Sequence, residues 1–210
     1  MIKIENTDVY GFEAAIRGMR NPKNSWEKSD SIDYGWGFVV GQNDIELMKS
    51  LSKAGTDHSK YLRFITITAD ITAPMFWWFE FDTYKVGTVK NSCSKMHKIH
   101  IKPFLYDDFT HEGIDEVTTD YPELKRIFRN YIETIEELRL LFNKTQEKKY
   151  WRALIEMLPE SYNMRATVLM NYQVLKNMYH ARKNHKLDEW HDFCRWCEEL
   201  PYFKEVCLEE

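Results

Sequence analysis

The chain has 210 residues, with 29 Lys and Arg against 33 Asp and Glu, and 43% of its residues are hydrophobic. This apolar content excludes an intrinsically disordered chain and is sufficient for a substantial core. The uncharged stretches fall far short of the roughly 20 apolar residues that a membrane span needs, and no apolar signal segment opens the chain. We therefore expect a cytoplasmic protein that does not enter a membrane, folded as one domain over residues 1–210.

Four cysteines occur in a chain rich in other core-forming residues, at Cys93, Cys194, Cys197 and Cys207. Disulfide frameworks belong to small secreted chains with weak cores, so we expect free thiols here. The net charge of −4 argues against general nucleic-acid binding.

One segment departs from this balance, because Thr83 to Tyr106 contains no Asp or Glu. Its simplest use is to hold an anion, although a solvated lysine loop would have the same composition. The five lysines of the segment are Lys85, Lys90, Lys95, Lys98 and Lys102.

Hydrophobic patterning and Gly or Pro signals predict the elements of the first half. In chain order they are a short edge strand at Ile2–Ile4, helices at Gly11–Met19 and Asn43–Ala54, a strand at Leu62–Thr72, and a helix at Met75–Phe81. Pro74 suits the start of that last helix, because its fixed φ and missing N–H are tolerated in a first turn. The basic segment is expected to be the exit loop.

The second half is predicted to be mostly helical. Asp120 can cap a helix that starts at Tyr121–Pro122 and carries an apolar stripe from Leu124 to Leu141. Further helices are expected at Lys148–Met157, Ala166–Arg182 and Asp188–Leu200. The predicted fold class is therefore α+β, a small, mostly antiparallel sheet with a dominant set of helices.

The stretch Ala73 to Lys98, APMFWWFEFDTYKVGTVKNSCSKMHK, resembles the central segment of flavin-dependent thymidylate synthases of the ThyX type. In that family a strand and an Ala-Pro helix start lead into the motif RHRxxSxNExSxRY. Without a gap, Lys85 and Lys95 keep the cationic character of two motif arginines, and Thr88 keeps a hydroxyl. Cys93 takes the place of the second motif serine.

A second stretch, Ala153 to Trp190, resembles the C-terminal run of the same family, where Asn171, Asn177 and Arg182 match at the family spacing. Thr83, Ile155 and Gln173 stand where the family has arginines, and Gln173 occupies a flavin-contacting position. Upstream, His58 falls on the histidine that opens a flavin-contacting segment.

The resemblance implies the ThyX-like fold and a homotetramer with FAD, a deoxyuridine monophosphate (dUMP) substrate, methylenetetrahydrofolate and NADPH. It implies methylation of uracil C5 without a cysteine nucleophile on the protein. The implied cofactor-binding residues are His58, Lys85, Asn171, Gln173 and Asn177. The implied substrate-binding residues are Glu80, Asn91, Cys93, Lys95 and Arg182, and no catalytic side chain is assigned.

Simpler interpretations compete with a ligand-binding site. Arg182 could be a surface arginine favoured by the dipole at a helix C-terminus. A helix turns about 100° per residue, so Asn171 and Arg182 would share one helical stripe and could face one ligand.

The CxxC pair at Cys194 and Cys197 could bind zinc, but no second pair exists, so we predict an ordinary amphipathic helix and no metal.

Two other functions compete with the enzyme. The loss of three family arginines favours a non-catalytic oligomer that keeps the fold and binds a nucleotide or a protein partner. Interleaved lysines and aromatics from Phe76 to Tyr106 could instead bind single-stranded nucleic acid. The acidic net charge makes this last function the least favoured.

Overall fold

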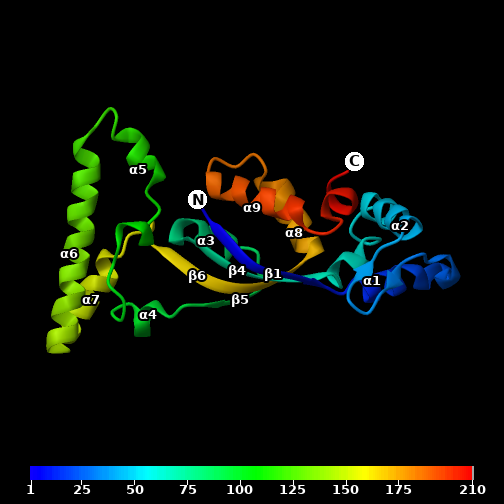
Figure 1. Ribbon diagram of the computed structural model, residues 1–210, viewed down its shortest axis with the longest axis horizontal. Coiled ribbons are helices and arrows are strands. Elements are labelled where there is room, and N and C mark those ends of the chain that lie inside the picture. The colour runs from blue at the N-terminus through cyan, green and yellow to red at the C-terminus, as the bar shows by residue number, and fades with distance from the viewer. Residues whose placement is uncertain (210) are drawn as a thin grey trace. The chain divides into compact units, whose positions relative to one another are not determined.

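The computed structural model describes residues 1–209 and combines many helices with a small main sheet (Figure 1). The strands are β1 (Lys3–Tyr10), β2 (Ile32–Asp33), β3 (Phe38–Val39), β4 (Thr66–Pro74), β5 (Val89–Ser92) and β6 (Asn163–Asn171). The helices are α1 (Phe12–Arg20), α2 (Gln42–Lys53), α3 (Met75–Phe81), α4 (Lys95–Lys98), α5 (Glu112–Val117), α6 (Glu123–Thr145), α7 (Lys148–Met157), α8 (Tyr172–Arg182) and α9 (Asp188–Glu199).

The main sheet has four strands in the order β1-β4-β6-β5, and β2 and β3 form a separate antiparallel pair. This confirms the predicted α+β class, with helices dominant and a small antiparallel sheet. The predicted edge strand at Ile2–Ile4 exists as the longer β1. None of the helices within residues 1–209 combines the length and apolar character needed to cross a bilayer.

The chain divides into two compact units, and the strands of the main sheet contribute residues to both. Unit 1 comprises Met1–Lys3, Thr72–Asp82 and Asn91–Ala166. Unit 2 comprises Ile4–Ile71, Thr83–Lys90 and Thr167–Glu210. A single domain over the whole chain stays a prediction.

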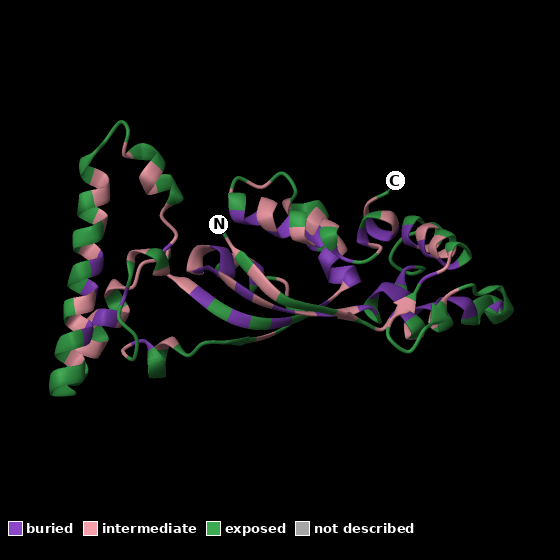
Figure 2. Ribbon diagram, in the orientation of Figure 1, coloured by how far each residue is buried: buried purple, intermediate pink, exposed green. Residues whose placement is uncertain are grey.

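The predicted helix Ala166–Arg182 is wrong in its first third, because the chain there forms β6 and the helix begins only at Tyr172. Buried and exposed residues alternate along β6, as the colours of Figure 2 show. Met164, Ala166, Val168 and Met170 are the buried set. This period of two is a strand pattern, and it overrides the helix propensity of Met, Leu and Ala.

Three smaller predictions are also corrected. The strand expected at Leu62–Thr72 starts later, since Lys60–Arg63 forms a 3-10 turn. The basic exit loop contains β5 and the short helix α4. The long helix α6 begins after Pro122 and has no side-chain cap, so Asp120 does not cap it. The backbone N–H of Asp120 instead donates to the carbonyl of Val117, the last residue of α5.

In unit 1, α6 packs against α7 over an apolar cluster. Ile132 and Ile135 of the predicted α6 stripe lie in this cluster, whereas Ile127 and Leu141, nearer the two ends of the stripe, are exposed. Ile155 packs against the same cluster from α7. The stripe therefore buries mainly its central turns, as expected for a helix that extends beyond its packing partner.

Unit 2 contains a buried ion pair that links α1 to α2. The Nε of Arg20 donates to Asp44 Oδ1 at 2.6 Å, and both side chains are almost fully buried. Ser29 and Ser31 each donate a hydroxyl hydrogen bond of 2.6 Å to Asp44 Oδ2. Burial alone would raise the pKa of Asp44, but the hydrogen bonds from Ser29, Ser31 and Arg20 together outweigh burial and hold it below its usual value.

We expect Asp44→Ala to lower the free energy of unfolding at pH 7 by about 3–5 kcal/mol, because it leaves the Arg20 charge buried and uncompensated. The folded pKa of Asp44 is depressed, so its contribution is complete above the unfolded pKa of about 3.9 and is lost as the pH falls through the folded value. Urea denaturation at pH 7 and pH 3 measures both effects.

The matched control is Glu156→Ala, which removes the exposed i,i+4 pair between Arg152 and Glu156. An exposed pair of this kind contributes less than about 0.5 kcal/mol. An equal decrease in the free energy of unfolding for the two variants would show that the buried pair stabilises the fold no more than an exposed pair does.

Candidate functional site

The ten predicted site residues are distributed over both units. Unit 1 holds Glu80, Asn91, Cys93 and Lys95, and unit 2 holds His58, Lys85, Asn171, Gln173, Asn177 and Arg182. Within each unit the structure brings some of them together.

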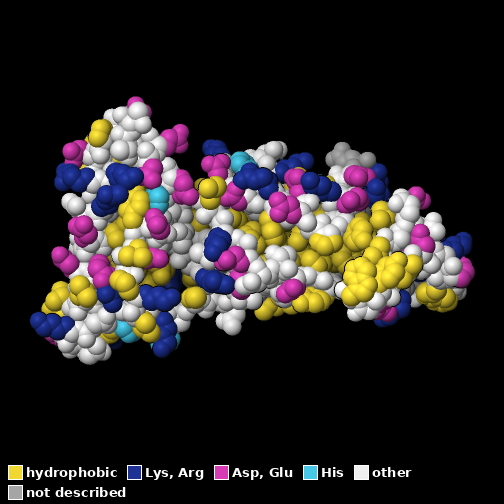
Figure 3. Space-filling model, in the orientation of Figure 1, with side chains coloured by type: hydrophobic (Ala, Val, Ile, Leu, Met, Phe, Trp, Pro, Cys, Tyr) yellow, Lys and Arg dark blue, Asp and Glu magenta, His cyan; other side chains and the backbone are white. Residues whose placement is uncertain are grey.

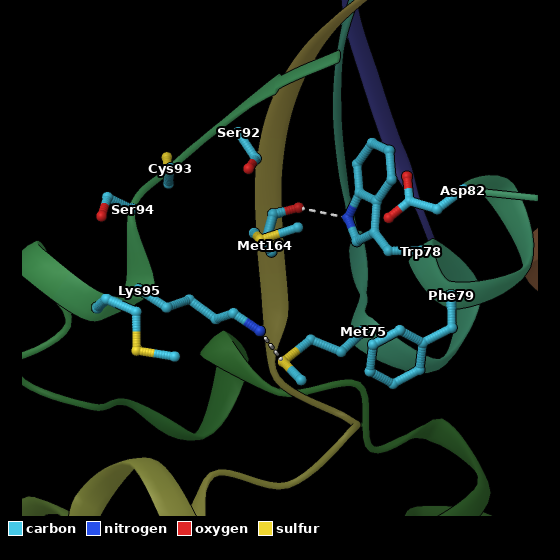
Figure 4. A pocket seen from close by; sticks show the side chains of 10 residues that line it. Met75, Trp78, Phe79, Asp82, Ser92, Cys93, Ser94, Lys95 and Met164 are labelled. Atoms are coloured by element: carbon cyan, nitrogen blue, oxygen red, sulfur yellow. Dashed lines mark hydrogen bonds between the residues drawn. The ribbon is translucent and has the colours of Figure 1, made fainter. Parts of the chain in front are cut away.

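Unit 1 contains a partly open pocket of about 310 Å³ (Figure 4). One face of α3 forms a side of it, since Met75, Trp78, Phe79 and Asp82 follow the i, i+3, i+4, i+7 spacing of a helix. The other lining residues are Ser92, Cys93, Ser94, Lys95 and Met96, from the end of β5 and the start of α4, together with Met164 of β6. The predicted residues Cys93 and Lys95 therefore share one pocket, whereas Glu80 and Asn91 are not part of its lining.

Hydrogen bonds fix both sides of this pocket. The indole Nε1 of Trp78 donates to the Met164 carbonyl at 2.8 Å, which ties α3 to β6. The backbone N–H of Cys93 donates to the Arg165 carbonyl at 3.0 Å. Lys95 reaches across the pocket, and its Nζ lies 3.0 Å from the Met75 sulfur. The result is a largely apolar cavity that is also lined by the hydroxyl and thiol groups of Ser92, Cys93 and Ser94, by the Lys95 ammonium group and by the Asp82 carboxylate.

The basic segment continues beyond the pocket into α4. Lys and Arg side chains gather on the surface around this helix (Figure 3). The hydroxyl of Ser94 caps α4 by accepting a hydrogen bond of 3.3 Å from the His97 N–H. The cations that follow the pocket are thus placed on the surface of unit 1.

In unit 2 the turn Thr83–Lys90 approaches the C-terminal end of α8. The Nε of Arg182 donates to the Tyr84 hydroxyl at 2.9 Å. The Arg182 guanidinium also lies 4.8 Å from the ring centre of Trp190 on α9 and 5.5 Å from that of Tyr84. Lys85 is exposed on the same turn. Two basic residues predicted from separate stretches thus lie in one region of unit 2.

The same turn approaches the N-terminal end of α8 at Gly87. Asn171 has extended dihedrals and is the N-cap of α8, where its Oδ1 accepts from the Val174 N–H at 3.0 Å. The predicted helical stripe shared by Asn171 and Arg182 is therefore wrong, since Asn171 lies outside the helix. A Cβ built on Gly87 would lie 2.8 Å from Asn171 Nδ2, and Gly87 has a φ of +82°.

Gln173 is buried near the start of α8, and both the oxygen and the nitrogen of its side-chain amide form hydrogen bonds within the protein. Its Oε1 accepts from the Ser59 hydroxyl at 3.0 Å, and its Nε2 donates to Asn177 Oδ1 at 3.2 Å. His58, beside Ser59, is exposed, as is Asn177. The amide of Gln173 thus connects the His58 turn to α8.

Sequence reasoning did not predict the contacts of Tyr84 and Trp190 with Arg182, nor the side of the pocket that α3 forms. The spacing of Met75, Trp78, Phe79 and Asp82 is a helical pattern that could have revealed one side of the pocket. No local pattern joins Tyr84 to Trp190, because their contact depends on how the turn meets α8 and α9.

The CxxC pair gives no support to a metal or redox site. Burial, followed by the charge of Glu198, raises the pKa of Cys194 to about 11, and burial raises that of Cys197 well above its usual value. All four cysteines are free, as expected. Within residues 1–209, no group of three or more His, Cys, Asp and Glu side chains is arranged to hold a metal ion.

No protein-family model and no curated protein matches the chain. Among solved structures it is similar to thymidylate synthase X (ThyX) from Helicobacter pylori with FAD and dUMP, with a TM-score of 0.71, 18% identity, and coverage of 99% of this chain and 98% of that one. A second ThyX structure from Helicobacter pylori, complexed with FAD and dUMP, matches with a TM-score of 0.70, 18% identity, and coverage of 99% and 100%. The chain therefore has the ThyX fold over its whole length, which confirms the resemblance at that level.

We expect Gly87→Ala to lower the free energy of unfolding by about 1–2 kcal/mol, because a left-handed conformation costs a residue with a Cβ roughly this amount. The methyl group also meets Asn171. Gly113→Ala in α5 is the control, since a Cβ there has no neighbour within 4 Å. Chemical denaturation of both variants provides the measurement, and an equal or larger loss in the control would contradict the prediction.

Proposed function

On the basis of the ThyX fold, we propose that the chain is a divergent flavin-dependent thymidylate synthase-like enzyme. It would bind FAD and a dUMP-type pyrimidine nucleotide and methylate or otherwise modify the base, with methylenetetrahydrofolate and NADPH as co-substrates. It would act as a homotetramer in the cytoplasm. The fold supports the class of protein, and the side chains described above support the choice of ligand.

The observation that carries this proposal is the placement of Arg182 in unit 2. Its guanidinium lies next to two aromatic rings, those of Tyr84 and Trp190, and near the cationic turn that bears Lys85. A guanidinium is a planar fork of donors that suits the flat acceptor edge of a pyrimidine, which a lysine cannot match. In unit 1, the pocket combines the Lys95 cation and the hydroxyl groups of Ser92 and Ser94 with the Asp82 carboxylate, and this lining suits a polar ligand.

The donors of unit 2 also fit a flavin dinucleotide, whose diphosphate is an anion. Lys85, His58 and Asn177 are exposed, and the segment from Thr83 to Tyr106 carries no carboxylate. These three side chains would hold the dinucleotide, while Gln173 would order the His58 turn. When bound, the flavin would supply the redox chemistry that the protein side chains lack.

One observation favours the second candidate, a non-catalytic ThyX-like oligomer that binds a nucleotide or a protein partner. Ile155, at a position where the family contacts phosphate with arginine, packs against the apolar cluster between α6 and α7. A hydrogen bond to a charged group contributes about 1.5–3 kcal/mol, so losing several such contacts removes orders of magnitude in affinity. Turnover decides between the two candidates.

We expect the purified protein to bind FAD and dUMP, as measured by flavin absorbance and by calorimetry. Arg182→Ala should weaken dUMP binding by about tenfold or more, because it removes charged donors to the base. Arg195→Ala is the matched control on α9, since Arg195 is exposed. Protein that neither carries nor binds FAD would contradict the proposal.

The enzymatic part has its own assay. Tritium release from dUMP labelled at C5, with FAD, NADPH and methylenetetrahydrofolate present, would support the enzyme and exclude the non-catalytic candidate. Binding of both ligands without release would leave the non-catalytic oligomer as the function.

We also expect dUMP to slow the alkylation of Cys93 by iodoacetamide, because Cys93 is the exposed cysteine and lines the pocket with Lys95. Peptide mass spectrometry measures the rate for each cysteine separately. The three buried cysteines, Cys194, Cys197 and Cys207, are internal controls and should react only after unfolding. An unchanged Cys93 rate at a dUMP concentration that saturates the protein would place the nucleotide outside this pocket.

A further inference from the structure

Arg182 has contacts on two sides of its guanidinium, both from unit 2. The Tyr84 hydroxyl accepts from its Nε at 2.9 Å, and the indole of Trp190 lies 4.8 Å from its Cζ. The two rings are themselves in contact, with centroids 6.3 Å apart and planes inclined at 68°. The guanidinium thus lies against a corner made of two inclined rings.

Both rings are held by their own surroundings. The Thr88 hydroxyl donates to the Tyr84 carbonyl, which closes the turn that carries Tyr84. Trp190 is fully buried at the start of α9 and packs edge-on against Phe193, with ring centroids 5.5 Å apart. The Tyr84 backbone and the Trp190 ring thus each have contacts of their own besides those with Arg182.

The two contacts restrict different motions of Arg182. A ring face next to the guanidinium attracts its charge and favours a stacked arrangement. The hydrogen bond to Nε then selects one rotation within that arrangement, which sets the direction of both Nη groups. The phenol oxygen that accepts this bond is an uncharged acceptor.

We infer that Tyr84 and Trp190 are positioning residues for Arg182 and hold its guanidinium in one plane for the edge of a pyrimidine base. This inference rests on the proposed function. Fixing the donors before the ligand arrives reduces the side-chain entropy that is lost on binding. Affinity for the base therefore depends on a tyrosine hydroxyl that need not touch the ligand.

The test uses Tyr84→Phe, which keeps the ring and removes the hydroxyl. Tyr179→Phe is the matched control, because Tyr179 lies on α8 with Arg182 but its hydroxyl donates to Glu198, at 2.7 Å. Nitrogen-15 NMR of arginine-labelled protein follows exchange of the Arg182 Nε–H with water, with the signal assigned by its loss in Arg182→Lys. Calorimetry then measures the dissociation constant for dUMP.

We expect Tyr84→Phe to speed exchange of the Arg182 Nε–H with water. It should also weaken dUMP binding by about three- to tenfold, because one hydrogen bond contributes about that much to an affinity. Tyr179→Phe should change neither quantity. Trp190→Phe, which keeps an aromatic face, should retain most of the affinity, whereas Trp190→Leu should lose it. The melting temperature of each variant shows whether it is folded.

Two results would overturn the inference. One is unchanged Nε–H exchange in Tyr84→Phe, which would mean that the hydroxyl does not hold Arg182. The other is faster exchange with unchanged dUMP affinity, which would make the contact purely structural. A wild-type protein that binds no dUMP would overturn the proposed function and the recognition role together, while the NMR signal would still report whether Tyr84 fixes Arg182.

Discussion

The junction at Asn171, where β6 ends and α8 begins, is the constraint on which the candidate site of unit 2 depends. The Tyr172 N–H donates to the Ile65 carbonyl at 3.0 Å, and the Asn171 side chain caps the first turn of the helix. A cap of this kind contributes about 1 kcal/mol, but here it also sets where the helix starts. Because α8 starts there, Gln173 meets Ser59 near one end of the helix and Arg182 meets Tyr84 at the other.

Features that repeat along the sequence could be predicted, and features that depend on contacts between distant segments could not. The apolar stripe of α6 and the Ala-Pro start of α3 are local patterns, and both elements form as expected. The strand β6 was missed, because its alternation uses Met and Ala, residues that also suit helices. The contact between Tyr84 and Trp190 links residues more than 100 positions apart, so neither neighbourhood shows it.

The resemblance to ThyX places family positions in the basic turn and α8, and the structure gives several of those positions specific partners. Gln173 is bonded at both ends of its amide, and Asn171 acts as a helix cap. Each of these roles is compatible with the fold whether or not a ligand binds. Among the predicted residues, Arg182 and Lys95 have the surroundings that most favour binding of a ligand. Arg182 lies next to a pair of aromatic rings, and Lys95 lines a cavity.

The unit 1 pocket also has a polarity across its width. Lys95 and Asp82 enter it from opposite sides, one as an ammonium group and the other as a carboxylate (Figure 4). Between them lie Trp78 and Met164, largely apolar side chains that screen the two charges less than water does. Such a field exerts a torque on any molecule with a permanent dipole moment, so a polar ring in this pocket would favour one orientation over its reverse.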